Sequence, residues 1–236
     1  MTQLSAVLIT KNESSNISDC LKTLTWADEI LVLDTGSTDD TISTAEAMGA
    51  KVARLECWEG FGKAKGHAVS LAANDWILSI DADERLSPEL IEELIALRKR
   101  DFEAKAWHIK RRSYYLGKAI RYCGWQNDAP LRLFNRKFGG FNDLPVHEGI
   151  RVSQERATCK SLMHHLTYPT VESHLKKMKL YGALASATRE NMFWAALRAT
   201  HKFVKMYILK LGFLDGYHGY LLCKNSARGI WYKYRQ

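Results

Sequence analysis

The sequence lacks any uninterrupted apolar run of about 18 residues, the length that a simple helix needs to cross a bilayer. Its first residues lead directly into Val7-Leu8-Ile9-Thr10, without a basic segment followed by a long apolar one, so we expect no signal peptide. The five cysteines are odd in number, scattered and without CxxC spacing, which argues against a disulfide framework or structural zinc and favours a reducing cytoplasm. Internal repeats and low-complexity linkers are also missing.

The composition is otherwise ordinary for a globular protein, with 236 residues, 46% of them hydrophobic and 25% charged. This length suffices for one substantial core, or for one core with a smaller appendage. The net charge of +8 is unevenly distributed: residues 1–170 carry 22 Lys and Arg against 23 Asp and Glu, whereas residues 171–236 carry 12 against three. Because acidic residues are so scarce in the tail, we expect an anionic neighbour there, either a membrane surface or a nucleic acid.

Short apolar runs alternate with segments of helical period over residues 5–100, which predicts a βαβ pattern and an α/β fold. The runs are Ala6–Ile9, Ile30–Leu33, Val52–Leu55 and Trp76–Ile80. Helices are expected at about 16–25, 39–48 and 88–98, the last with Ser87 as its N-cap and Pro88 at its first position. Right-handed crossovers bring the loops after such strands to one edge of the sheet, where ligands bind.

The most acidic segment, Ser79-Ile80-Asp81-Ala82-Asp83-Glu84, directly follows the fourth apolar run. Alternation in an extended strand exit predicts that Asp81 and Asp83 point the same way. Two such carboxylates suit Mg²⁺ or Mn²⁺, which take one or two carboxylates plus the oxygens of a substrate phosphate. Acidic residues after a strand can instead cap the next helix, but Ser87 already serves that purpose. The pattern therefore favours a metal-bound nucleotide or phosphosugar.

The other strand exits are polar as well. The first apolar run leads into Thr10-Lys11-Asn12-Glu13, and the second into the Asp34–Thr41 loop, whose Gly36 permits a tight turn. The carboxylate of Asp34 can accept a hydrogen bond from an N–H of a nucleotide base. A plain loop with a capping hydroxyl is an equally open interpretation. Lys65, near the start of a helix that begins at about Gly62, could approach an anion, or could be a solvated surface lysine.

Taken in order, these four segments resemble the motifs of the inverting family 2 glycosyltransferases, and the likeness covers roughly residues 4–150. A closer similarity to the bacterial lipopolysaccharide-core β-1,4-glucosyltransferases is suggested by Asp75–Arg85, Leu131–Phe134 and Val146–Glu148. The resemblance implies a GT-A fold over residues 1–170, with a Rossmann-like, mostly parallel central sheet flanked by helices. A basic helical extension, residues 171–236, would pack on it.

The same resemblance implies transfer of a hexose, glucose, from a UDP-sugar to a heptose of the lipopolysaccharide inner core, with galactose or N-acetylglucosamine donors and other acceptors as alternatives. A divalent cation, Mg²⁺ or Mn²⁺, would neutralise the departing diphosphate. The implied metal ligands are Asp83, Asp81 and His147. The implied nucleotide-sugar site consists of Thr10, Asn12, Glu13, Asp34, Lys65, Asp81 and Arg132.

In the family, the general base is an acidic residue of a Glu-Asp pair that follows an Arg-containing strand and a Gly-Phe turn. Here Arg132–Arg136, Gly140-Phe141 and then His147-Glu148 stand in that order, so Glu148 is the predicted base. Because the pair is His-Glu rather than Glu-Asp, Asp128 stays open as the alternative base.

The tail is predicted to be helical, with one apolar face and basic residues on the others. The apolar face contains Phe193, Leu197, Val204, Ile208 and Leu211. Such helices suit an anionic leaflet, and would place the enzyme peripherally on the inner face of the cytoplasmic membrane, near a lipid-linked saccharide acceptor. A solvated face on a packed helix is the alternative. Nucleic acid is not expected as a partner, because three acidic strand exits repel phosphate unless a cation mediates.

Overall fold

The structure is a computed structural model that describes residues 1–142, 149–184 and 191–235. It divides into two compact units. The first consists of Met1–Arg111 and Ala129–His164, and the second of Arg112–Asp128 and His165–Gln236. The second unit therefore combines the basic tail with a segment from the middle of the chain.

The predicted alternation of strands and helices is confirmed in the first unit. The strands are β1 (Leu4–Thr10), β2 (Glu29–Asp34), β3 (Lys51–Arg54) and β4 (Trp76–Ser79). The helices between them are α1 (Ile17–Lys22), α2 (Thr41–Ala47) and α3 (Phe61–Leu71). All four strands pair in parallel, so their carboxyl ends share one edge of the sheet.

In the described part of the chain, the main sheet has the order β3-β2-β1-β4-β8-β6-β11-β5, with β7 paired to β6. The added strands are β5 (Glu84–Leu86), β6 (Ala106–Tyr115), β7 (Lys118–Ala119), β8 (Leu131–Asn135) and β11 (Arg156–Tyr168). β8 runs antiparallel to both β4 and β6. A small second sheet pairs β9 (Gly139–Phe141) with β10 (Ile150–Val152). The predicted α/β class, a mostly parallel central sheet flanked by helices, is confirmed.

Alternating side chains of β1 build a core on each face of the sheet. Leu4, Ala6 and Leu8 pack with apolar residues of α1, α2 and α4 (Pro88–Lys99), whereas Val7 packs with residues of α3. Full burial of a side chain such as Leu8 contributes about 2 kcal/mol to folding. Since both faces are covered, the edge where the strands end is held in place from two sides.

Helix α4 begins as predicted. The Ser87 hydroxyl accepts a hydrogen bond from Leu90 N at 3.2 Å, and Pro88 occupies the first helical position, where its missing N–H costs nothing. Leu90, Leu94 and Leu97 are buried at the spacing of one helix face. This anchored helix fixes the chain that leaves the acidic segment.

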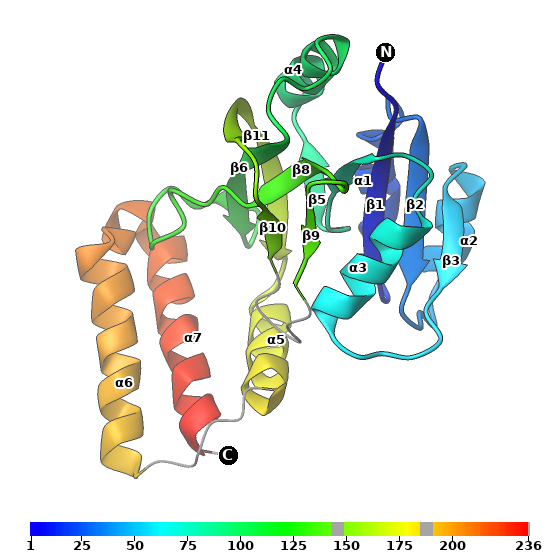
Figure 1. Cartoon of the computed structure of the whole chain (residues 1–236). Coiled ribbons are helices and arrows are strands. Elements are labelled where there is room, and N and C mark those ends of the chain that lie inside the picture. The colour runs from blue at the N-terminus through cyan, green and yellow to red at the C-terminus, as the bar shows by residue number, and fades with distance from the viewer. Residues whose placement is uncertain (143–148, 185–190, 236) are drawn as a thin grey trace. The chain divides into compact units, whose positions relative to one another are not determined.

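The second unit contains α5 (Val171–Leu184), α6 (Met192–Val204), a π-helical turn η1 (Lys205–Leu209), a 3₁₀ turn η2 (Gly212–Asp215) and α7 (Gly216–Arg235). Its core gathers Tyr115, Ile120, Cys123, Leu222 and Cys223. Helices α6 and α7 lie side by side (Figure 1). Within the described residues, no helix combines the length and the apolar character that crossing a membrane requires.

Candidate active site

The candidate site starts at the carboxyl ends of β1 and β2, where Thr10 and Asp34 are register partners. Asp34 Oδ2 accepts hydrogen bonds from Gly36 N and Ser37 N, each at 2.9 Å, and the positive φ of Gly36, 102°, permits this tight turn. Among the described residues, Thr10 Oγ1 and Asp34 Oδ1 are buried and have no hydrogen-bond partner. A buried polar atom without a partner costs about 1–3 kcal/mol, so this pair of oxygens indicates a place for a ligand donor.

The loops after β1 and β2 are tied to each other. Asn12 Oδ1 accepts from Thr38 N at 2.8 Å, while Asn12 N donates to Ser37 Oγ at 2.9 Å. Glu13 N donates to Thr41 Oγ1 at 2.8 Å. Asn12 has a φ of 56°, a left-handed conformation that asparagine tolerates better than most residues. Backbone and side-chain atoms of Asn12, together with the backbone of Glu13, thus hold the two loops together.

The acidic segment turns where an extended exit was expected, so the prediction of an extended strand exit through Asp81 and Asp83 is wrong. Glu84 N donates to Asp81 O at 2.9 Å, which closes a turn over Asp81–Glu84, and β5 begins at Glu84. Glu84 Oε2 also accepts from Asp81 N at 3.0 Å. The reason for the turn is the fully buried Glu84 carboxylate, which pairs with two arginines.

Five charged side chains meet at this turn, and we call them the charge cluster: Lys65, Asp81, Glu84, Arg111 and Arg132. Asp81 Oδ1 is 3.0 Å from Lys65 Nζ, and Asp81 Oδ2 is 2.5 Å from Arg132 Nη2. The same Arg132 nitrogen is 2.5 Å from Glu84 Oε1, which also accepts from Arg111 Nη1 at 3.0 Å. Three cations, from α3, β6 and β8, thus meet two carboxylates, one from the turn after β4 and one from the start of β5.

Burial alone would raise the pKa of Asp81, but the charges of Arg132 and Lys65 outweigh it and hold that pKa well below its usual range. Burial likewise opposes the charged form of Arg132, and the carboxylates of Asp81 and Glu84 raise its pKa above the usual value. Both groups therefore stay charged across the physiological pH range. The Arg132 Nε is buried and, in the part of the chain described, makes no hydrogen bond.

The oxygen ligands fit a hard divalent cation. In the described residues, no three His, Cys, Asp or Glu side chains gather as a complete ligand set. Mg²⁺ and Mn²⁺ do not need one when a phosphate supplies oxygens, because one or two carboxylates suffice. Asp83 is partly exposed in the turn beside Asp81, whose two oxygens already contact Lys65 and Arg132. A cation bound at this turn would have Asp81 and Asp83 as its nearby carboxylates.

Several predicted site residues are brought together in the first unit: Thr10 with Asp34, and Lys65 with Asp81 and Arg132. His147 and Glu148 lie outside the described residues. Asp128 belongs to the second unit.

Two residues of the charge cluster, Glu84 and Arg111, were not predicted. For Glu84 the signal was present, since three acidic residues in four positions need nearby cations. Arg111, in the middle of β6, carried no signal in the sequence.

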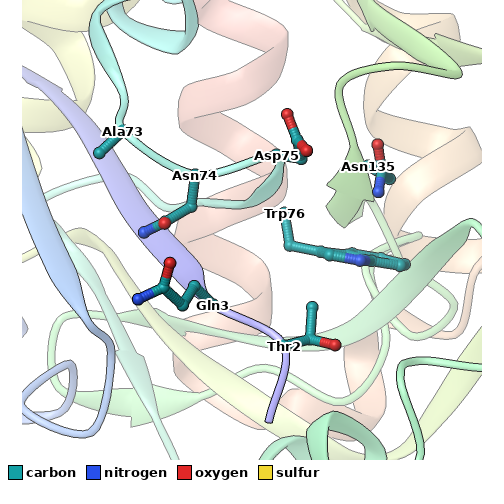
Figure 2. A pocket seen from close by; sticks show the side chains of 7 residues that line it. All are labelled: Thr2, Gln3, Ala73, Asn74, Asp75, Trp76 and Asn135. Atoms are coloured by element: carbon teal, nitrogen blue, oxygen red, sulfur yellow. The ribbon is translucent and has the colours of Figure 1, made fainter.

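A hollow of about 350 Å³ lies at the other end of the same strands (Figure 2). It is lined by Thr2, Gln3, Ala73, Asn74, Asp75, Trp76 and Asn135. These residues flank the amino ends of β1 and β4, whereas ligands of open α/β sheets bind outside the carboxyl ends. Asp75, its one carboxylate, pairs with Lys137 at 2.6 Å and with Arg136 at 3.5 Å. The hollow is therefore separate from the candidate site.

The polar strand ends and the charge cluster lie within residues 5–144, the part of the chain that matches the family model described as glycosyl transferase family 2. The chain belongs to this family. Its members transfer a sugar from an activated donor to an acceptor, so the candidate site is that of a glycosyltransferase.

Relatives of this glycosyltransferase include the lipopolysaccharide core biosynthesis glycosyltransferase LpsC of Rhizobium meliloti, 32% identical over 183 residues, which cover 75% of this chain and 68% of LpsC. An uncharacterized glycosyltransferase of Rickettsia typhi is 28% identical over 94% of this chain and 82% of its own length. Among solved structures, S. aureus TarS 1–349, crystallised with UDP, superimposes with a TM-score of 0.51 at 16% identity, covering 91% of this chain and 75% of TarS. The last likeness supports the fold alone.

Proposed function

We propose that this family 2 glycosyltransferase is an inverting enzyme that moves glucose from UDP-glucose to a heptose of the lipopolysaccharide inner core. The observation that carries the donor assignment is the buried Oδ1 of Asp34, without a partner in the described residues, beside the equally unpartnered Oγ1 of Thr10. The N3–H of uracil is a donor that fits Asp34, whereas cytosine has no N–H at that position. A uridine nucleotide is thus the ligand that these two oxygens favour.

The diphosphate of the donor is expected next to the cations of the charge cluster. Lys65 and Arg132 reach the strand edge from α3 and β8, and both can form charge-assisted hydrogen bonds with phosphate oxygens. Asp83, with Asp81 next to it, would hold Mg²⁺ or Mn²⁺. Bound there, the cation would stabilise the negative charge that develops on the leaving diphosphate.

The transfer itself is a single displacement. A carboxylate removes the proton of the acceptor hydroxyl, whose oxygen forms a bond to the anomeric carbon from the face opposite the diphosphate, and the bond to the diphosphate oxygen breaks. Inversion follows from this geometry. Glu148 is our proposed base and Asp128 the alternative, and His147 is proposed as a further metal ligand.

The acceptor assignment is supported by LpsC, whose name places it in lipopolysaccharide core biosynthesis. The donor sugar is supported by the sequence likeness to core β-1,4-glucosyltransferases, with galactose and N-acetylglucosamine as the competing donors. A core heptose is carried on lipid A, so the acceptor would be lipid-linked and present at the inner face of the cytoplasmic membrane. An enzyme that uses it benefits from residing at that surface.

The second unit supports such a location. Twelve of the fifteen exposed large hydrophobic side chains of the described residues lie between positions 192 and 220. We call them the apolar surface: Met192, Phe193, Trp194, Leu197, Val204, Ile208, Leu209, Leu211, Phe213, Leu214, Tyr217 and Tyr220. Helix α6 buries only Ala195, so its apolar stripe faces outward rather than into a core. An exposed patch of this kind indicates a binding surface.

The basic charge of the same region favours an anionic partner. Arg198, Lys205 and Lys210 are exposed among the apolar side chains, and residues 171–236 carry 12 basic against three acidic residues. A membrane with anionic lipid matches both properties, because apolar side chains enter the acyl boundary while each basic side chain near the headgroups adds about 1 kcal/mol. We therefore propose that the apolar surface docks on the cytoplasmic leaflet.

Calorimetry tests the donor site directly. The full chain is titrated with UDP-glucose, UDP-galactose and UDP-N-acetylglucosamine, each with Mn²⁺ and with chelator. We expect binding that depends on Mn²⁺ and is tightest for UDP-glucose, and we expect Asp83→Ala to remove the metal dependence. No binding under any condition would overturn the nucleotide-sugar site, while a tighter fit of another sugar would replace glucose.

Incorporation of labelled glucose into a lipopolysaccharide truncated after its heptoses tests the acceptor. The matched control is the same glycolipid without heptose, which should receive no label. Equal labelling of both would contradict a heptose acceptor and leave the donor assignment unaffected.

A further inference from the structure

The two carboxylates of the charge cluster differ in how far solvent reaches them. The Glu84 side chain is completely buried, whereas that of Asp81 is 31% exposed. Lys65 and Arg132 are themselves only 8% and 7% exposed, so Asp81 is the more solvent-accessible partner in both ion pairs. An anion that arrives from solvent can compete with Asp81 for these cations, but it cannot reach Glu84.

Arg132 also has hydrogen-bonding capacity that the described residues do not use. Arg132 directs a single nitrogen, Nη2, at both Asp81 and Glu84, and its buried Nε has no hydrogen-bond partner among the described residues. A guanidinium has five N–H donors in a fixed fork, which suits two parallel bonds to a phosphate. The described network leaves part of that capacity unfilled.

Resting on the proposed function, we propose that Asp81 is an exchangeable counter-ion: Lys65 and Arg132 pair with it in the donor-free protein and transfer to the diphosphate when the donor binds. Glu84 is the fixed partner in this exchange. It keeps Arg132 and Arg111 in place through its Oε1 and holds the backbone of Asp81 through its Oε2. Glu84 is therefore a positioning residue.

The exchange predicts a change in UDP affinity opposite to the change expected if Asp81 bound the nucleotide directly. If Asp81 competes with the diphosphate, Asp81→Asn should strengthen UDP binding when no metal is present. If Asp81 instead contacts the nucleotide directly, the same change should weaken it. The difference is measurable without turnover.

The experiment is calorimetry of the full chain with UDP in chelator, for wild type, Asp81→Asn and the control Asp75→Asn. Asp75 is a matched control because it also pairs with one lysine and one arginine of the first unit, but near the hollow at the opposite strand ends. We expect UDP affinity to rise about tenfold in Asp81→Asn and to stay unchanged in Asp75→Asn. Uridine, which has no phosphate, should bind all three proteins equally.

Unchanged or weaker UDP binding by Asp81→Asn would overturn the exchange, provided that wild type binds UDP with Mn²⁺. Absence of UDP binding by wild type in both buffers would overturn the proposed function and the exchange together.

Near-ultraviolet circular dichroism checks that the variant is folded. If it is not, a crystal structure of wild type with UDP and chelator decides: the exchange predicts Lys65 Nζ and Arg132 Nη2 on phosphate oxygens, with the contacts of Glu84 retained. Both cations still on Asp81 would overturn it.

Discussion

At the scale of single residues, the most informative atoms are the two buried oxygens that lack a partner, Thr10 Oγ1 and Asp34 Oδ1. They are costly for the folded state by itself, because burial removes their water without replacing it. If a ligand supplies the missing hydrogen bonds, removing one of these oxygens should stabilise the free protein and weaken the binding of the ligand.

Thr10→Val tests this opposition. Valine has nearly the same shape without the hydroxyl, so we expect the free energy of unfolding to rise by about 1 kcal/mol and the UDP affinity to fall. Denaturant titration and calorimetry measure the two quantities. The control is Thr35→Val: the Thr35 hydroxyl donates to Thr10 O at 2.9 Å, so its loss should lower stability. Loss of stability in Thr10→Val would contradict the interpretation.

The proposed base gives a second prediction at this scale. Glu148→Gln should bind UDP-glucose as wild type does but lose transfer by at least about a hundredfold, because an amide cannot take up the acceptor proton. Asp128→Asn is the matched control and should keep its transfer rate. Binding is measured by calorimetry and transfer by labelled glucose. The reverse pattern would move the base to Asp128.

The charge cluster shows most clearly which parts of the site can be predicted from the sequence. Lys65, Asp81 and Arg132 were predicted from motifs that each occupy a short stretch of chain, and the structure brings them together. The role of Glu84 was missed because its partners come from far along the chain: Arg132 is 48 positions away and Arg111 is 27. Such pairings depend on strand order, which no local pattern encodes.

At the scale of elements, the same distinction separates correct from incorrect predictions. The capped start of α4 and the four parallel strands are local patterns, and both are confirmed. The extended exit through Asp81–Asp83 was wrong because a long-range contact, the burial of Glu84 against arginines, bends the chain into a turn. Tertiary pairing overrides local alternation at this point.

Helix α5 contains a buried histidine that makes the stability of the second unit depend on pH. His174 is 1% exposed, stacks on Tyr168 with ring centroids 4.2 Å apart, and has Nδ1 3.3 Å from the Tyr115 hydroxyl. Burial, with a smaller effect of the Lys177 charge, lowers its pKa to about 4. Below the ordinary pKa of about 6.5, the unfolded chain binds a proton that the folded unit does not.

The sign follows from this difference in proton uptake. Stability should rise with pH between about 4 and 6.5, and so fall by about 2 kcal/mol when the pH is lowered from 7 to 5. Denaturant unfolding at several pH values measures it, and His174→Gln should flatten the dependence in this window. Parallel curves for wild type and His174→Gln would contradict the assignment.

At the scale of the whole molecule, the chain divides its chemistry between the two units. The first holds the polar strand ends and the charge cluster, while the second carries the apolar surface and the basic excess. Composition alone predicted the basic tail. The sequence favoured an apolar stripe that faces a membrane but left a packed helix open, because an amphipathic pattern is the same for a helix that buries its apolar face in a core and for one that presents it to a membrane.

The last prediction concerns membrane binding by the apolar surface. Leu209 and Leu214 are 70% and 53% exposed, and replacing both by serine removes two side chains that would each gain about 2 kcal/mol on entering the acyl boundary. We expect Leu209→Ser/Leu214→Ser to lower flotation with vesicles of anionic lipid at least tenfold. Trp58→Ser, which removes a similarly exposed side chain from the first unit, is the control and should bind as wild type.

Binding to vesicles of different composition and the oligomeric state in gel filtration distinguish membrane docking from the binding of another partner to this surface. Binding should disappear with neutral lipid and weaken at high salt, because the basic side chains contribute through screened charges. Equal binding of the double serine variant to anionic vesicles would contradict membrane docking. A wild-type dimer in gel filtration that the double variant abolishes, without vesicle binding by either protein, would assign the apolar surface to a second copy of the chain instead.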